Sequence, residues 1–256
     1  MICRELISII EEKYPREAAL EWDNVGLLVG RVEKDIQKVF VALDLTDDVV
    51  DEAIDKGVDL IVTHHPMIFE PQRRITDETL VGRRLIRLLQ NDIGCYAAHT
   101  NYDVLQMAQL AEARLGLVDA KVLEETGWNE EGIGRIGALK QEMALEECCE
   151  MVKEAFDLTS VKVFGDLKGS VRIAAISPGS GKSMIQIAIE KGADVLITGD
   201  IDHHAGIDAV AEGMAIIDAG HYGLEYIFME DMTGFLRKRT DLEVEMKKVS
   251  FPFQNL

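Results

Sequence analysis

The sequence predicts an α/β protein built from two similar units, and a repeated pattern is the main reason for this fold class. Residues 52–63 and residues 187–198 both contain a helix end, a Lys-Gly pair and an apolar strand that ends in Thr. One apolar strand precedes each segment and another follows it, so each half reads strand, helix, strand, helix, strand. This alternation predicts mainly parallel sheets with right-handed crossovers.

The first half begins with a predicted helix and continues with three predicted strands. Ile2, Leu6 and Ile10 lie at helical spacing among charged residues, which is typical of an amphipathic helix and not of a signal peptide. Strands are expected at 38–44, at the end of the repeated segment, and at 94–98. They are continuous apolar runs, as in parallel strands that are buried on both faces.

The second half repeats this order, with further strands expected at 171–177 and 214–218. The halves join in the Gly-rich, acidic stretch Glu124–Gly137, which gives the expected domains 1–124 and 125–256. The helix and strand near the C-terminus are alternatively expected to pack on the first unit. Gly57 and Gly192 follow the two repeated helices, where a helix end needs a left-handed residue.

Composition narrows the classes of function. The net charge of −19 at pH 7 argues against a nucleic-acid surface, but not against a small anionic substrate, because bound metal ions reverse the local field. No apolar run reaches the ~18–20 residues of a membrane span. The four cysteines show no CxxC pairing, so reduced thiols and a cytoplasmic location are expected.

All six histidines fall in four short clusters, each at or just after the end of a predicted strand. The clusters are His64-His65, His99, His203-His204 and His221. Ligands of open α/β sheets bind beyond the carboxyl ends of the strands, which is where these clusters lie. Imidazole nitrogen and nearby carboxylate oxygen are ligands for Zn, Mn or Fe, so the clusters predict a metal site.

Two of the clusters have a spacing that suits chelation. His64 and His65 reach one site only if the strand ends and the backbone turns there, as the following Pro66 indicates. His221 and Glu225 are spaced i, i+4 at a helix start, which puts both side chains on one face. The alternatives are ordinary histidines at a strand end and a helix start with Glu225 as a capping carboxylate.

The other two clusters leave their roles open. Asp103 is a candidate ligand, and His99 either binds the metal or orients a ligand, while a simple turn is the alternative. His203 and His204 form a proton shuttle, line the pocket, or belong to a polar helix start.

The segment Ser177–Ser183, SPGSGKS, follows a strand and precedes a helix, as a phosphate-binding loop does. Its last three residues match the P-loop pattern, but the first glycine of that pattern would fall at Ile176. An ATPase is therefore not expected. The segment is either a Gly-rich turn whose backbone N–H groups hold an anion or a plain turn between strand and helix.

Seven blocks of the sequence resemble the signature blocks of the Nif-three-like family, whose members are described as GTP cyclohydrolase 1 type 2 homologues. The blocks occur in the family's order and cover nearly the whole chain. They are WDNVGLLVG (22–30), ALDLT (42–46), LIVTHHPMIF (60–69), AHTNYD (98–103), PGSGKS (178–183), LITGDIDHH (196–204) and IDAGHYGLE (217–225).

The resemblance implies the short form of the family, without an insertion domain. It implies two α/β halves related by an internal pseudo-twofold duplication, with a dinuclear metal site between them and two divalent ions per chain. It also implies a toroidal homohexamer. The family's metal ligands map onto His64, His65, Asp103, His221 and Glu225.

The predicted function is a dinuclear metal-dependent hydrolase that acts on a nucleotide or similar small anion, with GTP cyclohydrolase activity as one form. Five protein ligands leave positions on two metal ions open for water, which two-metal sites use in hydrolysis. His99 and His204 are the candidate catalytic bases, and Gly181 and Lys182 are the candidate substrate-binding residues. The alternative is a non-catalytic metal-binding or metal-trafficking protein, or a regulatory ring.

Overall fold

The computed structural model describes residues 1–254, and the chain divides into two compact units. Unit 1 consists of Met1–Tyr102 and Phe228–Val249, and unit 2 of Asp103–Ile227 and, among the described residues, 250–254. The first division therefore falls after Tyr102, earlier than the expected boundary after residue 124. The C-terminal helix and strand belong to unit 1.

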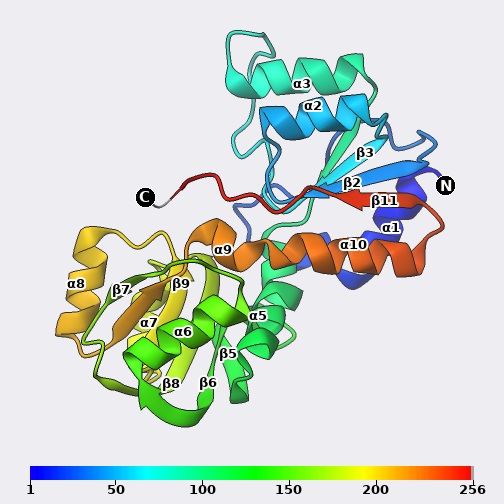
Figure 1. Cartoon of the computed structure of the whole chain (residues 1–256). Coiled ribbons are helices and arrows are strands. Elements are labelled where there is room, and N and C mark those ends of the chain that lie inside the picture. Colours follow the sequence, from blue (N-terminus) through cyan, green and yellow to red (C-terminus); the bar gives the residue numbers. More distant parts are fainter. Residues whose placement is uncertain (255–256) are drawn as a thin grey trace. The chain divides into compact units, whose positions relative to one another are not determined.

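Unit 1 is a five-stranded sheet with helices on both faces (Figure 1). Its elements are α1 (Cys3–Lys13), η1 (Arg16–Ala18), β1 (Gly26–Val29), β2 (Lys38–Ala42), α2 (Asp47–Asp55), β3 (Leu60–Thr63), α3 (Leu80–Gln90), β4 (Gly94–Ala97), α4 (Thr100–Tyr102), α10 (Ile227–Arg239) and β11 (Glu243–Met246). The strand order is β1-β4-β3-β2-β11. Only β1 runs antiparallel to its neighbour within this sheet.

Local sequence signals explain where the helices of unit 1 begin and which faces they bury. Thr46 and Thr79 cap α2 and α3 by accepting a hydrogen bond from the backbone N–H of the third residue of each helix. Helix α1 buries Leu6 and Ile10, which confirms the predicted amphipathic helix. Helices α2 and α3 cover one face of the sheet, and α1 and α10 cover the other (Figure 1).

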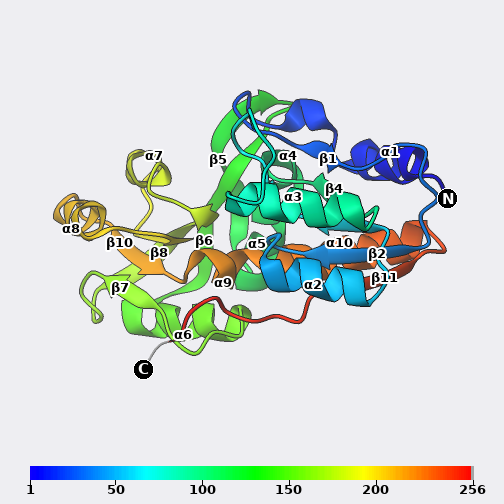
Figure 2. The same cartoon turned by 90° about the horizontal axis from the view of Figure 1, so that it is seen from above.

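Unit 2 is built on a six-stranded sheet with the order β5-β6-β8-β9-β10-β7. Its elements are η2 (Asp103–Met107), α5 (Ala108–Leu115), β5 (Val118–Trp128), β6 (Glu131–Ala144), α6 (Leu145–Ala155), β7 (Lys162–Phe164), β8 (Ser170–Ser180), α7 (Met184–Glu190), β9 (Val195–Gly199), α8 (His203–Ala211), β10 (Ala215–Asp218) and α9 (His221–Glu225). Strands β8, β9 and β10 are parallel. Helices α7 and α8 pack on one face, opposite α6 (Figure 2).

The stretch Glu124–Gly137, expected to join the halves, lies instead within a hairpin of the second sheet. Strands β5 and β6 pair antiparallel around a turn at Asn129 and Glu130, both of which have left-handed backbone angles. Gly132 allows the two strands to pack closely, since a Cβ there would lie 1.9 Å from the Glu124 carbonyl oxygen. Because of this hairpin and β7, three of the five strand pairings in unit 2 are antiparallel, so the expected mainly parallel arrangement holds only for unit 1.

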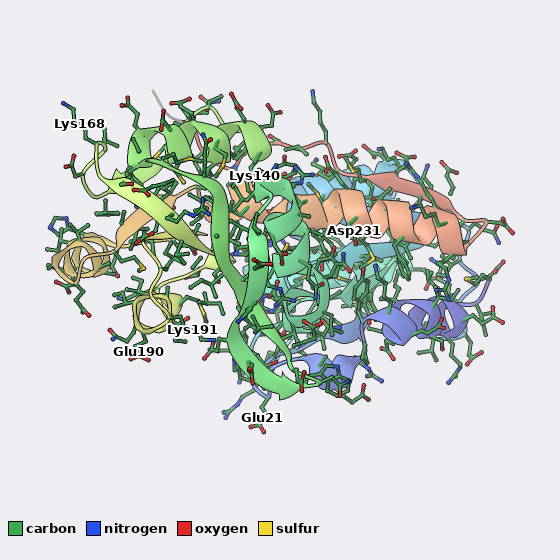
Figure 3. The ribbon with its side chains drawn as sticks, turned by 90° about the horizontal axis from the view of Figure 1, so that it is seen from below. Glu21, Lys140, Lys168, Glu190, Lys191 and Asp231 are labelled. Carbon is green, nitrogen blue, oxygen red and sulfur yellow. The ribbon has the colours of Figure 1, made fainter. Side chains whose placement is uncertain are left out.

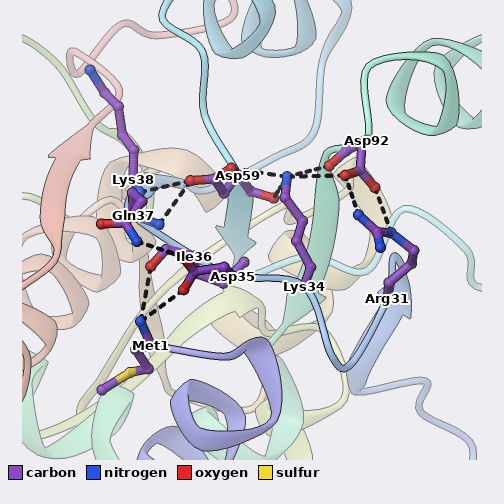
Figure 4. Close-up of polar contacts among 9 residues, drawn as sticks. All are labelled: Met1, Arg31, Lys34, Asp35, Ile36, Gln37, Lys38, Asp59 and Asp92. Atoms are coloured by element: carbon purple, nitrogen blue, oxygen red, sulfur yellow. Dashed lines mark hydrogen bonds and ion pairs between the residues drawn. The ribbon is translucent and has the colours of Figure 1, made fainter.

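Ion pairs and hydrogen bonds of charged residues connect the amino ends of the strands in unit 1 (Figure 4). Lys34 forms an ion pair with Asp59, which precedes β3, and donates a hydrogen bond to the carbonyl of Asp92, which precedes β4. Asp92 also pairs with Arg31. The histidine clusters follow the carboxyl ends of these strands, so structural ion pairs and candidate ligands lie at opposite ends of the sheet.

Two further expectations concern membranes and thiols. Across residues 1–254, every helix is too short or too polar to cross a bilayer. The four cysteines are buried free thiols. Burial raises the pKa of Cys95 and of Cys148 to about 12, which keeps these thiols protonated and unreactive at neutral pH.

Candidate metal centre

The backbone turns at His64 and His65, as the following proline predicted. Strand β3 ends at Thr63, and the amides of His64 and His65 both donate to the carbonyl of Leu43, at 3.2 and 3.0 Å. The Thr63 hydroxyl donates to the His65 carbonyl at 2.9 Å. This turn lets two consecutive side chains lie close together, with ring centroids 4.8 Å apart.

A third imidazole joins this pair from the end of the neighbouring strand β4. The ring centroid of His99 lies 5.1 Å from that of His64 and 5.5 Å from that of His65. One potential ligand atom from each of the three residues lies within 4.8 Å of the others. Such a group is able to hold one metal ion.

Each of the three rings places its Nδ1 against an oxygen acceptor within unit 1. The acceptors are the Ala98 carbonyl for His64, Asp44 for His65 and Asp23 for His99, at 2.8, 2.8 and 2.9 Å. A carbonyl or carboxylate oxygen accepts, so Nδ1 carries the proton and the lone pair of the neutral ring is on Nε2. Metal-binding histidines are oriented in this way by second partners.

Asp23 is the more enclosed of the two carboxylate acceptors, since its side chain is fully buried whereas that of Asp44 is half exposed. Burial by itself would raise the pKa of this carboxyl. The hydrogen bond and charge of His99, with hydrogen bonds from the hydroxyl and amide of Thr100, outweigh burial and lower the pKa of Asp23 to about 2. Asp23 is therefore an anion at neutral pH and favours a proton on the facing nitrogen of His99.

Unit 2 carries a second group at the ends of β9 and β10. The Nε2 atom of His221 lies 2.9 Å from Oε2 of Glu225, and its Nδ1 lies 2.7 Å from Oδ2 of Asp200. Glu225 is buried, whereas Asp200 is half exposed and has a left-handed backbone with φ of 58°. The i, i+4 pair therefore lies on one helical turn, as its spacing predicted.

Glycines make room for this second group. A Cβ on Gly199 would lie 2.4 Å from the backbone nitrogen of His221, and one on Gly179 would lie 2.4 Å from Oε1 of Glu225. A Cβ on Gly181 would lie 1.8 Å from the Thr198 hydroxyl. The glycines of the SPGSGKS segment are thus required by packing around Glu225 and Thr198.

The remaining predicted residues occupy different surroundings. Asp103 is the partly buried first residue of η2, a π-helical turn of the kind often found at functional sites. His203 and His204 are exposed at the start of α8. Lys182 is exposed, and its ammonium group pairs with Asp202 at 2.6 Å.

Sequence reasoning missed Asp23 and Asp44, the carboxylates that orient His99 and His65. Both lie inside blocks that resemble those of the family, Asp23 in WDNVGLLVG and Asp44 in ALDLT. Their partners are 76 and 21 residues away along the chain, so spacing gave no signal.

Comparison with known proteins identifies what this chain resembles. A model of the family Duf34/NIF3 (NGG1p interacting factor 3) matches residues 1–252. A Clostridium perfringens protein named GTP cyclohydrolase 1 type 2 homolog is 35% identical over 260 residues, which cover 99% of each chain. A Streptococcus pneumoniae protein of the same name is 39% identical over 92% of this chain and 90% of its own.

Solved structures agree with this match. A Bacillus cereus protein related to NIF3 superposes with a TM-score of 0.93 at 27% identity, over 100% of this chain and 99% of its own. Reduced HcgD from Methanocaldococcus jannaschii superposes with a TM-score of 0.85 at 32% identity, over 96% and 97% of the two chains. The mixed α/β fold with two sheets is therefore shared with these proteins.

Proposed function

The chain belongs to the Duf34/NIF3 family, and from this premise we propose that it is a metal-dependent hydrolase acting on a nucleotide or similar small anion. The observation that carries the proposal is the group of three imidazoles in unit 1, whose candidate ligand atoms lie within 4.8 Å of one another. The names of the curated relatives support a nucleotide as the substrate.

Divalent metal ions fit these residues. The Nδ1 atoms of His64, His65 and His99 face oxygen acceptors, which leaves Nε2 to bind a metal. Imidazole ligands suit Zn and Fe, and carboxylate ligands suit Mn. When bound, divalent ions lower the pKa of water and stabilise the charge that develops during hydrolysis. Three enclosed imidazoles that are oriented in the same way are difficult to explain by packing alone.

We assign His64, His65 and His99 as imidazole ligands from unit 1, and His221, Glu225 and Asp103 as ligands from unit 2, for two ions per chain. His99 is therefore proposed as a ligand here, in place of the base expected from its position in the sequence. The reason is that its Nδ1 faces the Asp23 carboxylate, as in oriented metal ligands.

The other side chains have roles in substrate binding and proton transfer. Lys182 and the backbone of Gly181 would bind the anionic part of the substrate, and an incoming anion would compete with Asp202 for the ammonium group. His204 is exposed beside Asp202 on α8 and would act as the proton acceptor.

We also infer that the two units are copies of one α/β unit and that the chain assembles as a toroidal hexamer. The order β1-β4-β3-β2 in unit 1 has the same strand directions as β7-β10-β9-β8 in unit 2, which supports the duplication. Light scattering at micromolar concentration should report six copies of the 28.5 kDa chain. A stable monomer would contradict the hexamer.

Metal analysis of purified variants tests the metal centre. His65→Ala and His221→Ala should each lower the metal bound per chain, whereas the control His203→Ala, on the exposed start of α8, should not. Full metal occupancy in a protein that lacks both His65 and His221 would exclude the assignment.

Turnover tests the hydrolase itself. GTP and a panel of nucleotides and phosphoesters should be assayed with Zn, Mn, Fe and Mg, and at least one should be hydrolysed in a metal-dependent reaction. Lys182→Ala should mainly raise KM. If metal stays bound and no compound reacts, the hydrolase is excluded and the non-catalytic metal-binding or regulatory function takes its place.

A further inference from the structure

Two large aromatic side chains of unit 1 are exposed beside the imidazole group. Trp22 is 62% exposed and Phe69 is 54% exposed, and their ring centroids lie 5.9 and 5.8 Å from that of His99. The side chain of His99 is only 13% exposed. Large aromatic rings are normally buried, so two exposed rings around one enclosed imidazole indicate a surface that binds something.

Hydrogen bonds hold the backbone that carries Trp22. The residue lies in a turn closed by the Asp23 amide, which donates to the Leu20 carbonyl at 2.9 Å, and the Leu20 amide donates to the Thr100 hydroxyl at 2.9 Å. Asp23 in turn accepts from Thr100 and His99. Glu21, the residue before Trp22, is exposed and is labelled in Figure 3, where it shows the position of this turn at the surface. The turn is thus fixed to the same residues that orient His99.

A further hydrogen bond ties this turn to the segment that carries Phe69. The amide side chain of Asn24 donates to the carbonyl of Ile68 at 2.6 Å. Trp22 and Phe69 therefore extend from two segments that are anchored to each other. A backbone held in this way loses little conformational freedom when a ligand binds to the two rings, which favours affinity.

The orientation of the rings leaves surface for a planar ligand. Trp22 and Phe69 meet the imidazole of His99 edge to face, at interplanar angles of 74° and 87°. Such a contact uses at most one face of each aromatic ring, and the exposed fractions show that solvent reaches the rest. Aromatic faces bind nucleobases by stacking, which needs no particular pattern of hydrogen bonds.

We propose that Trp22 and Phe69 form an aromatic subsite that stacks the planar heterocycle of the substrate, a purine base or a ring of similar shape, next to His99. The inference rests on the proposed function in one respect, since it treats the His99 group as the reaction centre. It adds the substrate class: a compound with a flat aromatic ring, and not an aliphatic phosphoester.

Binding without turnover tests the subsite. The chain has two tryptophans, so a Trp128→Phe background leaves Trp22 as the only indole reporter. GMP should quench and shift its fluorescence, whereas ribose 5-phosphate, which has the same anion but no base, should not. By calorimetry, Trp22→Leu and Phe69→Leu should each weaken GMP binding about tenfold, because loss of one stacking ring has roughly that effect.

Controls separate stacking from other causes. Trp22→Phe should retain most of the affinity, and Leu89→Ala, at another exposed apolar residue of unit 1, should not change it. Equal affinity for GMP and ribose 5-phosphate would overturn the subsite, as would Leu variants that alter only the number of associated copies. Neither result bears on the metal content of the wild-type protein, which tests the proposed function separately.

Discussion

The two units share their backbone design at the amino ends of their strands and differ at the carboxyl ends. Asp59 in unit 1 accepts hydrogen bonds from the amides of Gln37 and Lys38, and Asp194 in unit 2 accepts from those of Arg172 and Ile173. A second pair of backbone hydrogen bonds also corresponds between the units. The amide of Gly94 donates to the Asp59 carbonyl, and the amide of Ala215 donates to the Asp194 carbonyl, both at 2.9 Å.

At the carboxyl ends the same positions hold different chemistry. Strands β3 and β9 both end near a threonine, and the next two residues are His64 and His65 in unit 1 but Gly199 and Asp200 in unit 2. Unit 1 thus presents candidate ligands directly from the strand, whereas in unit 2 the strand supplies the carboxylate that orients His221. The two units thus have matching backbone contacts at the amino ends of their strands, whereas the residues that follow the carboxyl ends, where function is commonly located, differ.

The largest effect should come from filling the space that Gly199 leaves. Gly199→Ala would place Cβ 2.4 Å from the His221 nitrogen, so the loop before α9 must move. We expect about 1–3 kcal/mol of destabilisation in urea unfolding, together with loss of bound metal. Gly234→Ala is the control, because α10 has open space there, and it should be neutral or slightly stabilising. Unchanged stability and metal content in the Gly199 variant would contradict this account.

The carboxylates that orient the histidines should contribute differently to metal affinity in the two units. Asp23→Asn removes a fully buried anion facing His99 and should weaken metal binding about 10–100-fold. Asp200→Asn should weaken it less, because water already reaches this half-exposed carboxylate. Competition with a fluorescent chelator measures both affinities. An equal or larger loss in the Asp200 variant would show that burial does not decide the strength of these contacts.

Alanine substitutions at the corresponding helix ends of the two units should lower the stability of the protein by the same amount. Gly57 and Gly192 have φ of 62° and 78°, and a Cβ on either would meet open space. Alanine at each position should therefore cost only the left-handed backbone conformation, about 1 kcal/mol. Urea unfolding of the two single variants should give the same loss. A difference well above 1 kcal/mol would mean that the two turns are not equivalent.

The smallest expected effect on stability comes from an ion pair on β11, the edge strand of the sheet in unit 1. Hydrogen bonds from Lys38 and Lys56 lower the pKa of Glu245 to about 2. A lowered pKa stabilises the fold above the ordinary value near 4.5, and this contribution is lost as the pH falls through about 2. Glu245→Gln should therefore lose roughly 0.5 kcal/mol at pH 6 and almost nothing near pH 2.

Acid unfolding followed by circular dichroism measures this difference. Glu154→Gln, at an exposed residue of α6 in unit 2, is the control and should follow the wild type at every pH. A constant difference between the Glu245 variant and the wild type from pH 6 to pH 2 would show that titration of this ion pair is not the cause.

Periodicity and turn chemistry predicted the elements of the fold well, because apolar strands and Lys-Gly helix ends are local signals. The hairpin of β5 and β6 was not predicted, since its glycines and acidic residues are also typical of a linker. The prediction of a turn after Thr63 was correct because Pro66 restricts the residue before it. Asp23 was missed because its link to His99 depends on tertiary structure that spacing does not record.

The return of the chain to unit 1 has a consequence for how the protein is made. Residues 103–227 of unit 2 are contiguous, whereas unit 1 needs β11 as the neighbour of β2 and Phe228, whose ring centroid lies 5.2 Å from that of His64. A ribosome makes Phe228 and β11 only after residues 103–227, and domains generally fold as their sequence emerges. Nascent unit 1 therefore waits until residues 103–227 have been made, and its imidazole group is enclosed only after Phe228 and β11 have emerged.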